Sequence, residues 1–176
     1  MNRRAVVVGI LSAASAGCID RLHDVAASTP RNLRVRSRYV DGNPLLDGQS
    51  VRSRPEELPT YAASFRSADE ASLALRANAE SSLAFVAETS FAADGGDSVL
   101  VVAQRLTAPA VELRLGSVSR TGDHSLRIAV DEAGSRGEPD DDELAVKTLL
   151  LRLTDDRGPP ARVVVSIGGE RAGVTI

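Results

Sequence analysis

Short runs in which apolar and polar residues alternate dominate the chain after residue 97 and restrict it to a β-rich fold. Two of these runs are 111–115 and 125–130, where every second residue is Val, Leu or Ile. A period of two places successive side chains on opposite faces of a strand. Two further runs, Ser98–Ala103 and Leu144–Leu153, are apolar on most positions, which is typical of central strands covered on both faces.

Turn-forming residues separate these runs. The phase of the alternation changes at Gly116, which indicates a β-bulge. Arg120–Asp123 reads as a hairpin turn in which Gly122 takes a positive φ, and Gly168 and Gly169 read as turn glycines before a last short strand, Gly173–Ile176. Short strands about 8–15 residues apart predict a mainly β (α+β) domain, an antiparallel β-sandwich or open barrel.

The first half adds a strand and one short helix. Leu33–Val40 alternates, with Arg34, Arg36 and Arg38 on the face opposite Leu33, Val35 and Tyr39. Ser67 and Glu70 fit a capping box, so a helix is expected from Ala68 to about Asn78, which Leu73, Leu75 and Ala79 suit. A second turn or two of helix is expected within Ser81–Ala87, and Tyr61–Arg66 is expected to be a short strand.

The N-terminus has the layout of a secretory signal. Met1–Arg4 is positively charged, Ala5–Gly17 is an uncharged run of 13 residues, and Cys18 follows. A run of this length is shorter than the ~20 residues that span a bilayer, which excludes a permanent transmembrane helix in this interpretation. The organisation predicted is a signal peptide at 1–17, a tether at 18–30 and a β-rich domain at 31–176.

Cys18, the only cysteine, is the predicted attachment point of a lipid. The small residues before it, Ala14–Gly17, resemble a lipobox, and a lone cysteine in an exported chain has no internal disulfide partner. A buried helix with a chance cysteine is the competing interpretation. Lipidation implies anchoring at the outer face of the cytoplasmic membrane.

Arg3 and Arg4 resemble the pair of a twin-arginine export signal, which carries folded proteins. The chain departs from that pattern by having Ala5 and Val6 where Phe and Leu are usual. Two arginines also suit the general secretory route, so both routes stay open.

The charge and the scarcity of aromatic residues argue against nucleic-acid binding. The net charge is −3, aromatic residues make up 3% of the chain, and Trp is absent. Phosphate binding needs a basic surface and base stacking needs exposed rings. Lys147 is the only lysine beside twenty arginines, a bias that resembles proteins of salt-loving archaea and also arises in GC-rich genomes.

One segment resembles a known type of protein. The residues Phe85-Val-Ala-Glu-Thr-Ser-Phe91 and Ser98-Val-Leu-Val-Val-Ala-Gln104, followed by Thr148–Leu153, are similar to uncharacterised exported lipoproteins of halophilic archaea. A fainter similarity links them to the β domain of a small accessory subunit of bacterial surface protease complexes. This resemblance implies a fold and a place in the cell, with no catalytic residue to carry over.

Two groups of charged residues could bind a ligand, but ordinary surface charge is the favoured interpretation of both. Glu138 and Asp140–Glu143 have oxygen ligands for calcium, but their order does not fit a calcium loop, and a solvated acidic loop is the favoured interpretation. The arginine stripe Arg34, Arg36 and Arg38 would suit anionic lipid heads. Pairing with carboxylates of an acidic protein is favoured.

No catalytic, cofactor or metal constellation is predicted. His23 lies in the tether and His124 beside a turn, which gives neither a Ser-His-Asp site nor a zinc site. Three functions remain open: a non-enzymatic accessory module that binds another surface protein, a hydrolase using carboxylates such as Asp97, Glu112 or Asp131, and a ligand-capturing lipoprotein of a transport system.

Overall fold

The computed structural model describes residues 29–53, 59–134 and 144–176. The predicted signal peptide with Arg3 and Arg4, the lipid site Cys18, His23, most of the tether and the acidic run Asp140–Glu143 lie outside these residues. Within them, no helix is both long and apolar enough to cross a membrane.

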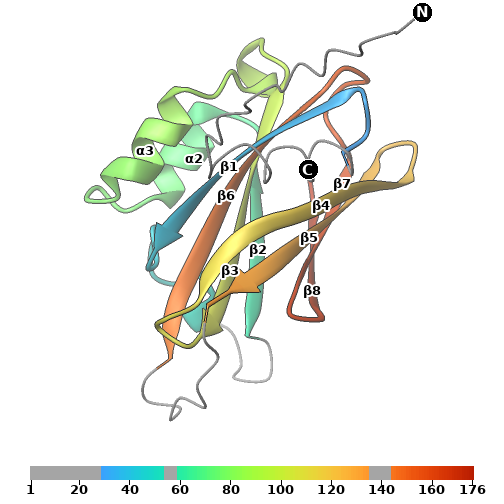
Figure 1. Ribbon diagram of the computed structural model, residues 1–176. Coiled ribbons are helices and arrows are strands. Elements are labelled where there is room, and N and C mark those ends of the chain that lie inside the picture. Colours follow the sequence, from blue (N-terminus) through green and yellow to red (C-terminus); the bar gives the residue numbers. More distant parts are fainter. Residues whose placement is uncertain (1–28, 54–58, 135–143) are drawn as a thin grey trace, which may run out of the picture.

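The described residues form two four-stranded sheets packed face to face, which confirms the predicted β-sandwich (Figure 1). The first sheet has the order β1-β6-β3-β2 and the second the order β4-β5-β7-β8. The strands are β1 Leu33–Asp41, β2 Thr60–Phe65, β3 Ser98–Thr107, β4 Glu112–Gly122, β5 Ser125–Ala133, β6 Ala145–Asp155, β7 Arg162–Ile167 and β8 Glu170–Thr175.

One pairing departs from the antiparallel expectation. Strands β5 and β7 run parallel, with Ser125 opposite Arg162, while the other neighbouring pairs are antiparallel. The chain leaves β5, crosses to the other sheet as β6 and returns to β7, so β7 starts at the same end as β5. A hairpin between neighbours would have forced the opposite direction.

The first sheet is covered on both faces, as expected for its central strands. On β3, Val99 and Val101 point into the interior of the sandwich, while Leu100 and Val102 pack under the helices. The helices α2 Ala68–Ala74 and α3 Glu80–Ala87 form a third layer on the outer face of this sheet (Figure 1). Two short 3-10 turns, Val51–Ser53 and Ala92–Asp94, complete the elements.

The capping box is confirmed, but the helix behind it is shorter than predicted. The Ser67 hydroxyl accepts from the Glu70 amide at 3.2 Å, and the Glu70 carboxylate accepts from the Arg66 amide at 3.1 Å. The helix ends at Ala74 because Leu75 turns to an extended conformation and bridges to Leu45. On α2 the buried residues are Ala71 and Ala74, whereas Leu73 is 77% exposed.

The hairpin between β4 and β5 turns two residues later than predicted. Strand β4 continues through Gly122, which pairs with Ser125, and the turn consists of Asp123 and His124. Gly122 has no positive φ, so the expectation of a left-handed glycine there is wrong. The register between β4 and β5 instead shifts between Arg120 and Gly122, next to the turn. The bulge predicted at Gly116 is confirmed by the shift between Leu115 and Ser117.

The other glycine turn is confirmed, and it lengthens the last strand. Gly168 and Gly169 have φ values of +57° and +93°, which suit a two-residue hairpin turn. Strand β8 therefore begins at Glu170 rather than at Gly173.

Two buried ion pairs join the sheets. The Arg105 Nε atom on β3 lies 3.0 Å from a Glu132 carboxylate oxygen on β5, and the Arg120 Nη2 atom on β4 lies 2.6 Å from a carboxylate oxygen of Asp155 on β6. Both carboxylates are almost completely buried. Each pair therefore links strands that are far apart in the chain.

Candidate functional site

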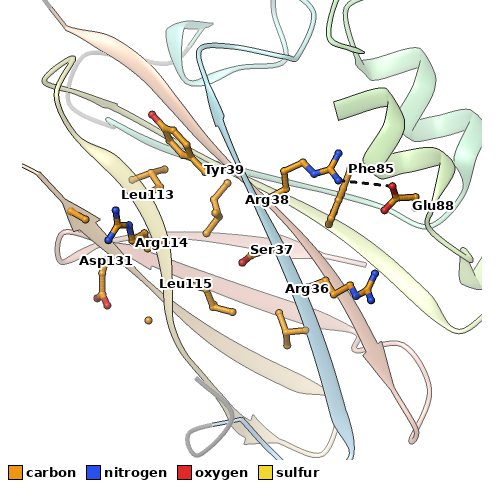
Figure 2. A pocket seen from close by; sticks show the side chains of 14 residues that line it. Arg36, Ser37, Arg38, Tyr39, Phe85, Glu88, Leu113, Arg114, Leu115 and Asp131 are labelled. Atoms are coloured by element: carbon orange, nitrogen blue, oxygen red, sulfur yellow. Dashed lines mark ion pairs between the residues drawn. The ribbon is translucent and has the colours of Figure 1, made fainter. Parts of the chain in front are cut away.

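The two open edges of the sandwich differ. On one side, β2 and β8 meet, and the Ser64 hydroxyl donates to the Thr175 carbonyl at 3.1 Å. On the other side, a groove of about 830 Å³ follows the free edge of β1. Figure 2 shows β1 crossing between β4 on one side and α3 on the other, with side chains of all three turned to the groove.

The backbone of β1 presents hydrogen-bonding groups to this groove that no other described residue uses. The Gly42 amide donates to the Val146 carbonyl and the Asp156 amide to the Asn32 carbonyl, both at 3.0 Å, so the even positions of this ladder bond toward β6. Bonded and non-bonded pairs alternate in an antiparallel ladder. The backbone groups of Val35, Ser37 and Tyr39 therefore point away from β6, toward the groove.

The wall on the sandwich side includes four apolar side chains, with Arg114 and Asp131 also in the groove lining. Leu113 and Leu149 are buried, and Val35 and Leu115 are half-buried. Ser37 shares the inward face of β1 with Val35, yet it is exposed, because its side chain is small and β4 stands away from β1 at this point. The sandwich interior is therefore accessible beside Ser37.

On the helix side the groove is lined by Arg36, Arg38, Phe85 and Glu88, and Arg152 contacts the same ring from outside this lining. The guanidinium carbons of Arg38 and Arg152 lie 5.1 and 4.9 Å from the centre of the Phe85 ring, a cation–π distance. The Glu88 carboxylate lies 3.9 Å from Arg38 and 3.5 Å from Arg152 (Figure 2). The Glu88 carboxylate is therefore the ion-pair partner of both Arg38 and Arg152.

Arg36 differs from its neighbours in the stripe. Arg34 pairs with Asp97 at 3.3 Å and with Asp156 at 3.8 Å, and Arg38 pairs with Glu88. The favoured expectation of carboxylate pairing thus describes these two arginines. Arg36 is exposed, makes no ion pair with another described residue, and stands directly opposite Arg152 in the β1–β6 register.

Tyr39 lines the groove and interacts with Lys147, a buried lysine outside the groove lining. The Tyr39 hydroxyl donates to the Val111 carbonyl at 3.5 Å, and the Lys147 Nζ atom lies 2.6 Å from the Asp41 carboxylate. Burial raises the pKa of Tyr39 above 10.0, although the charge of Lys147 opposes it. Burial alone would lower the pKa of Lys147, but its hydrogen bond to Asp41 and the charges of Tyr39 and Asp41 raise it above 10.5.

These shifts predict a loss of stability in alkaline solution. Both groups favour the folded state when protonated, so their contribution is complete below pH 10.0 and is lost as the pH rises through the higher folded pKa values. We expect the free energy of unfolding in urea to fall above about pH 10, and to fall less steeply in the Lys147→Met variant. A wild-type profile that stays level through about pH 11.5 would contradict this.

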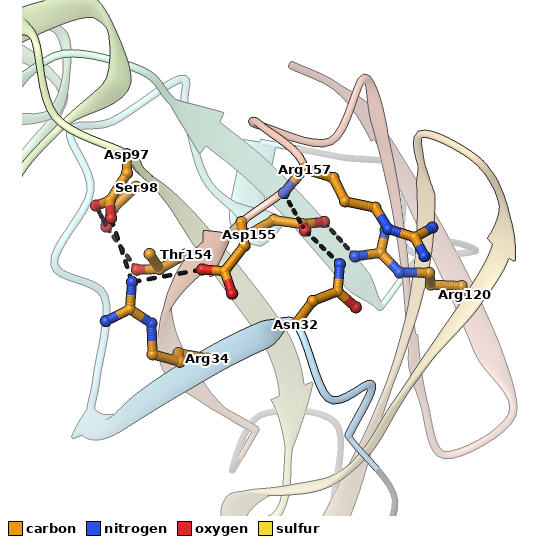
Figure 3. A network of polar contacts seen from close by, with 9 residues as sticks. Asn32, Arg34, Asp97, Ser98, Arg120, Thr154, Asp155 and Arg157 are labelled. Atoms are coloured by element: carbon orange, nitrogen blue, oxygen red, sulfur yellow. Dashed lines mark hydrogen bonds and ion pairs between the residues drawn. The ribbon is translucent and has the colours of Figure 1, made fainter.

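The carboxylates named as hydrolase candidates do not meet in one cavity. Asp131 lines the groove beside Gly116, whereas Glu112 pairs with Arg114 at 2.8 Å. Asp97 lies at another end of the first sheet, where it holds Arg34 (Figure 3). His124 lies in the hairpin turn, and the described part of the chain has no group of three potential metal-ligating side chains.

The groove itself was missed by sequence reasoning. One signal pointed to it: Ser37 interrupts the inward row Leu33, Val35, Tyr39 with a small polar residue. Such an interruption shows only that this position is not in the core. It cannot show which strand lies next to it.

Comparisons with protein families, with curated proteins and with solved structures found no match for this chain. The resemblance to exported halophilic lipoproteins therefore stays a prediction from the sequence.

Proposed function

We propose that this protein is a binding or accessory module that holds an extended segment of another surface protein as an added strand on β1. The observation that carries this is the free edge of β1, whose outward backbone groups at Val35, Ser37 and Tyr39 lie in a groove with two walls. In strand addition, main-chain hydrogen bonds supply affinity and alternate side chains supply specificity. A groove on both sides of the edge offers contacts for both rows of side chains.

The contrast between the two open edges supports this assignment. Exposed strand edges promote aggregation, so proteins usually cover or charge them. Strand β8 is partly closed by the contact between Ser64 and Thr175. Within the described residues, no hydrogen bond of this kind closes β1 along Val35–Tyr39, and the strand instead borders the groove between β4 and α3. Such an edge would favour added strands whose side chains are complementary to both sides of the groove.

The location of the module is proposed from the sequence. A lipid on Cys18, delivered by a signal beginning with Arg3 and Arg4, would tie the domain to the outer face of the cytoplasmic membrane through the tether 18–30. The partner would then be another protein at that surface. Mass spectrometry of the exported chain should find Cys18 at the N-terminus and lipidated, and an uncut chain with a free thiol would refute this placement.

A proline on the free edge tests the binding mode. Ser37→Pro removes one outward N–H and no hydrogen bond to β6, a position where an edge strand tolerates proline. Peptides selected from a random library against the membrane-anchored chain in detergent should bind this variant about tenfold more weakly or worse. The readout is the dissociation constant by fluorescence polarisation, with circular dichroism to verify folding.

The matched control is Arg171→Pro on the β8 edge. The Ile176 amide donates to the Ala161 carbonyl, which places the N–H of Arg171 on the outward side of β8 by the same alternation. This variant should keep the wild-type affinity. Equal weakening by both prolines, or a library that yields no binding peptide, would overturn the proposed function.

A further inference from the structure

We propose that the segment accepted by β1 has one acidic residue between two apolar residues. This inference rests on the proposed strand addition and specifies its side chains. An added strand continues the pleat of the sheet, so its successive side chains point alternately to the two faces. Residues opposite Val35 and Ser37 would point to the sandwich side of the groove, and the residue opposite Arg36 would point to its helix side.

The apolar positions follow from the sandwich side of the groove. Leu113, Leu115 and Leu149 line it, and exposed Ser37 leaves space that a larger neighbour would have filled. A side chain opposite Ser37 would enter this space and contact the leucines. Because Leu113, Leu115 and Leu149 present aliphatic carbon on this side, an aliphatic side chain packed on them would remove the most apolar surface from water.

The acidic position follows from the charges on the helix side. Among the described residues, the ion pairs along β1 and beside α3 join three arginines, Arg34, Arg38 and Arg152, to the carboxylates of Glu88, Asp97 and Asp156, and Arg36 belongs to none of these pairs. Arg36 stands opposite Arg152, and like charges directly opposite each other destabilise a sheet. The Nε and Nη2 atoms of Arg152 also lack a hydrogen bond. A carboxylate opposite Arg36 would relieve this excess of positive charge.

The same arginines disfavour a second copy of this chain as the occupant. If two β1 edges paired antiparallel, their outward odd residues would bond to each other, and their even residues would also stand opposite one another. Arg34, Arg36 and Arg38 would then face arginines of the second copy. The charge pattern therefore favours a different chain with an acidic residue at this position.

The test compares two peptides on two forms of the protein. Both peptides have the pattern Thr-Thr-Val-X-Leu-Thr-Thr, with X as Glu in one and Lys in the other. On the wild-type chain the Glu peptide should bind about three- to tenfold more tightly than the Lys peptide. On the Arg36→Glu variant this preference should reverse.

Arg127→Glu is the matched control, because it makes the same charge change at an exposed position on β5 in the other sheet. It should leave the preference as in the wild type, and circular dichroism should show both variants folded. Two outcomes would overturn the preference for an acidic residue while leaving strand addition intact. In the first, both peptides bind the wild-type chain equally and Ser37→Pro weakens both. In the second, the preference does not reverse in Arg36→Glu. Absence of binding by either peptide at millimolar concentration would count against both proposals, as would a dimer in sedimentation that Ser37→Pro dissociates.

Discussion

Replacing Asp155 with alanine is expected to lower the free energy of unfolding by about 3–5 kcal/mol, because it leaves a buried arginine without its counter-charge. The Asp155 carboxylate is 1% exposed and accepts from Asn32 at 3.1 Å, from Arg120 at 2.6 Å and from the Arg157 amide at 3.0 Å (Figure 3). Arg120 is itself only 16% exposed, and its Nε atom makes no hydrogen bond. The loss would be measured by urea denaturation.

Asp97→Ala is the control for this variant. Its ion pair with Arg34 also joins a carboxylate and an arginine, but both side chains are more than half exposed. Exposed pairs contribute about 0–1 kcal/mol, so this variant should lose little stability. The double variant Asp155→Leu with Arg120→Met should recover part of the loss, because it removes both buried charges. Equal, small losses in Asp155→Ala and Asp97→Ala would refute the role given to burial.

Replacing Phe91 with alanine is expected to cost about 3–5 kcal/mol, the range for large aromatic side chains in a core. Phe91 is 1% exposed and belongs to the core between the first sheet and the helices, with Leu100 and Leu150 from the sheet below it. Its backbone also bridges to Ser98 at the start of β3. A cavity at this point would loosen the helical layer, so amide exchange in α2 and α3 should accelerate more than exchange in β5 and β7.

Leu73→Ala is the corresponding control, since Leu73 lies on α2 but is 77% exposed. Its stability should change by less than about 0.5 kcal/mol. If Leu73→Ala proved as costly as Phe91→Ala, the outer face of α2 would have to be covered in solution, and the arrangement of this layer described above would be wrong.

Local patterns in the chain predicted the elements well where short-range geometry decides them. The alternation around Leu126–Val130 predicted a strand, the Ser67–Glu70 spacing predicted a helix start, and the phase change at Gly116 predicted a bulge. Each depends on residues a few positions apart. Where a local pattern failed, as at the end of α2 and at Gly122, the bridge between Leu75 and Leu45 or the pairing with the neighbouring strand changed the outcome.

By itself, the sequence determined that this chain forms short strands of a β-sandwich or open barrel with a short helix, since the period of two dictates which side chains can be buried together. It did not determine strand order, the parallel pair β5–β7, or the edge of the sandwich that stays open. Those depend on contacts between residues far apart in the chain, such as Arg34 with Asp97 and Arg120 with Asp155. Only the tertiary structure pairs Arg34 and Arg38 with carboxylates and leaves Arg36 beside a free strand edge, because ion pairs form between neighbours in space.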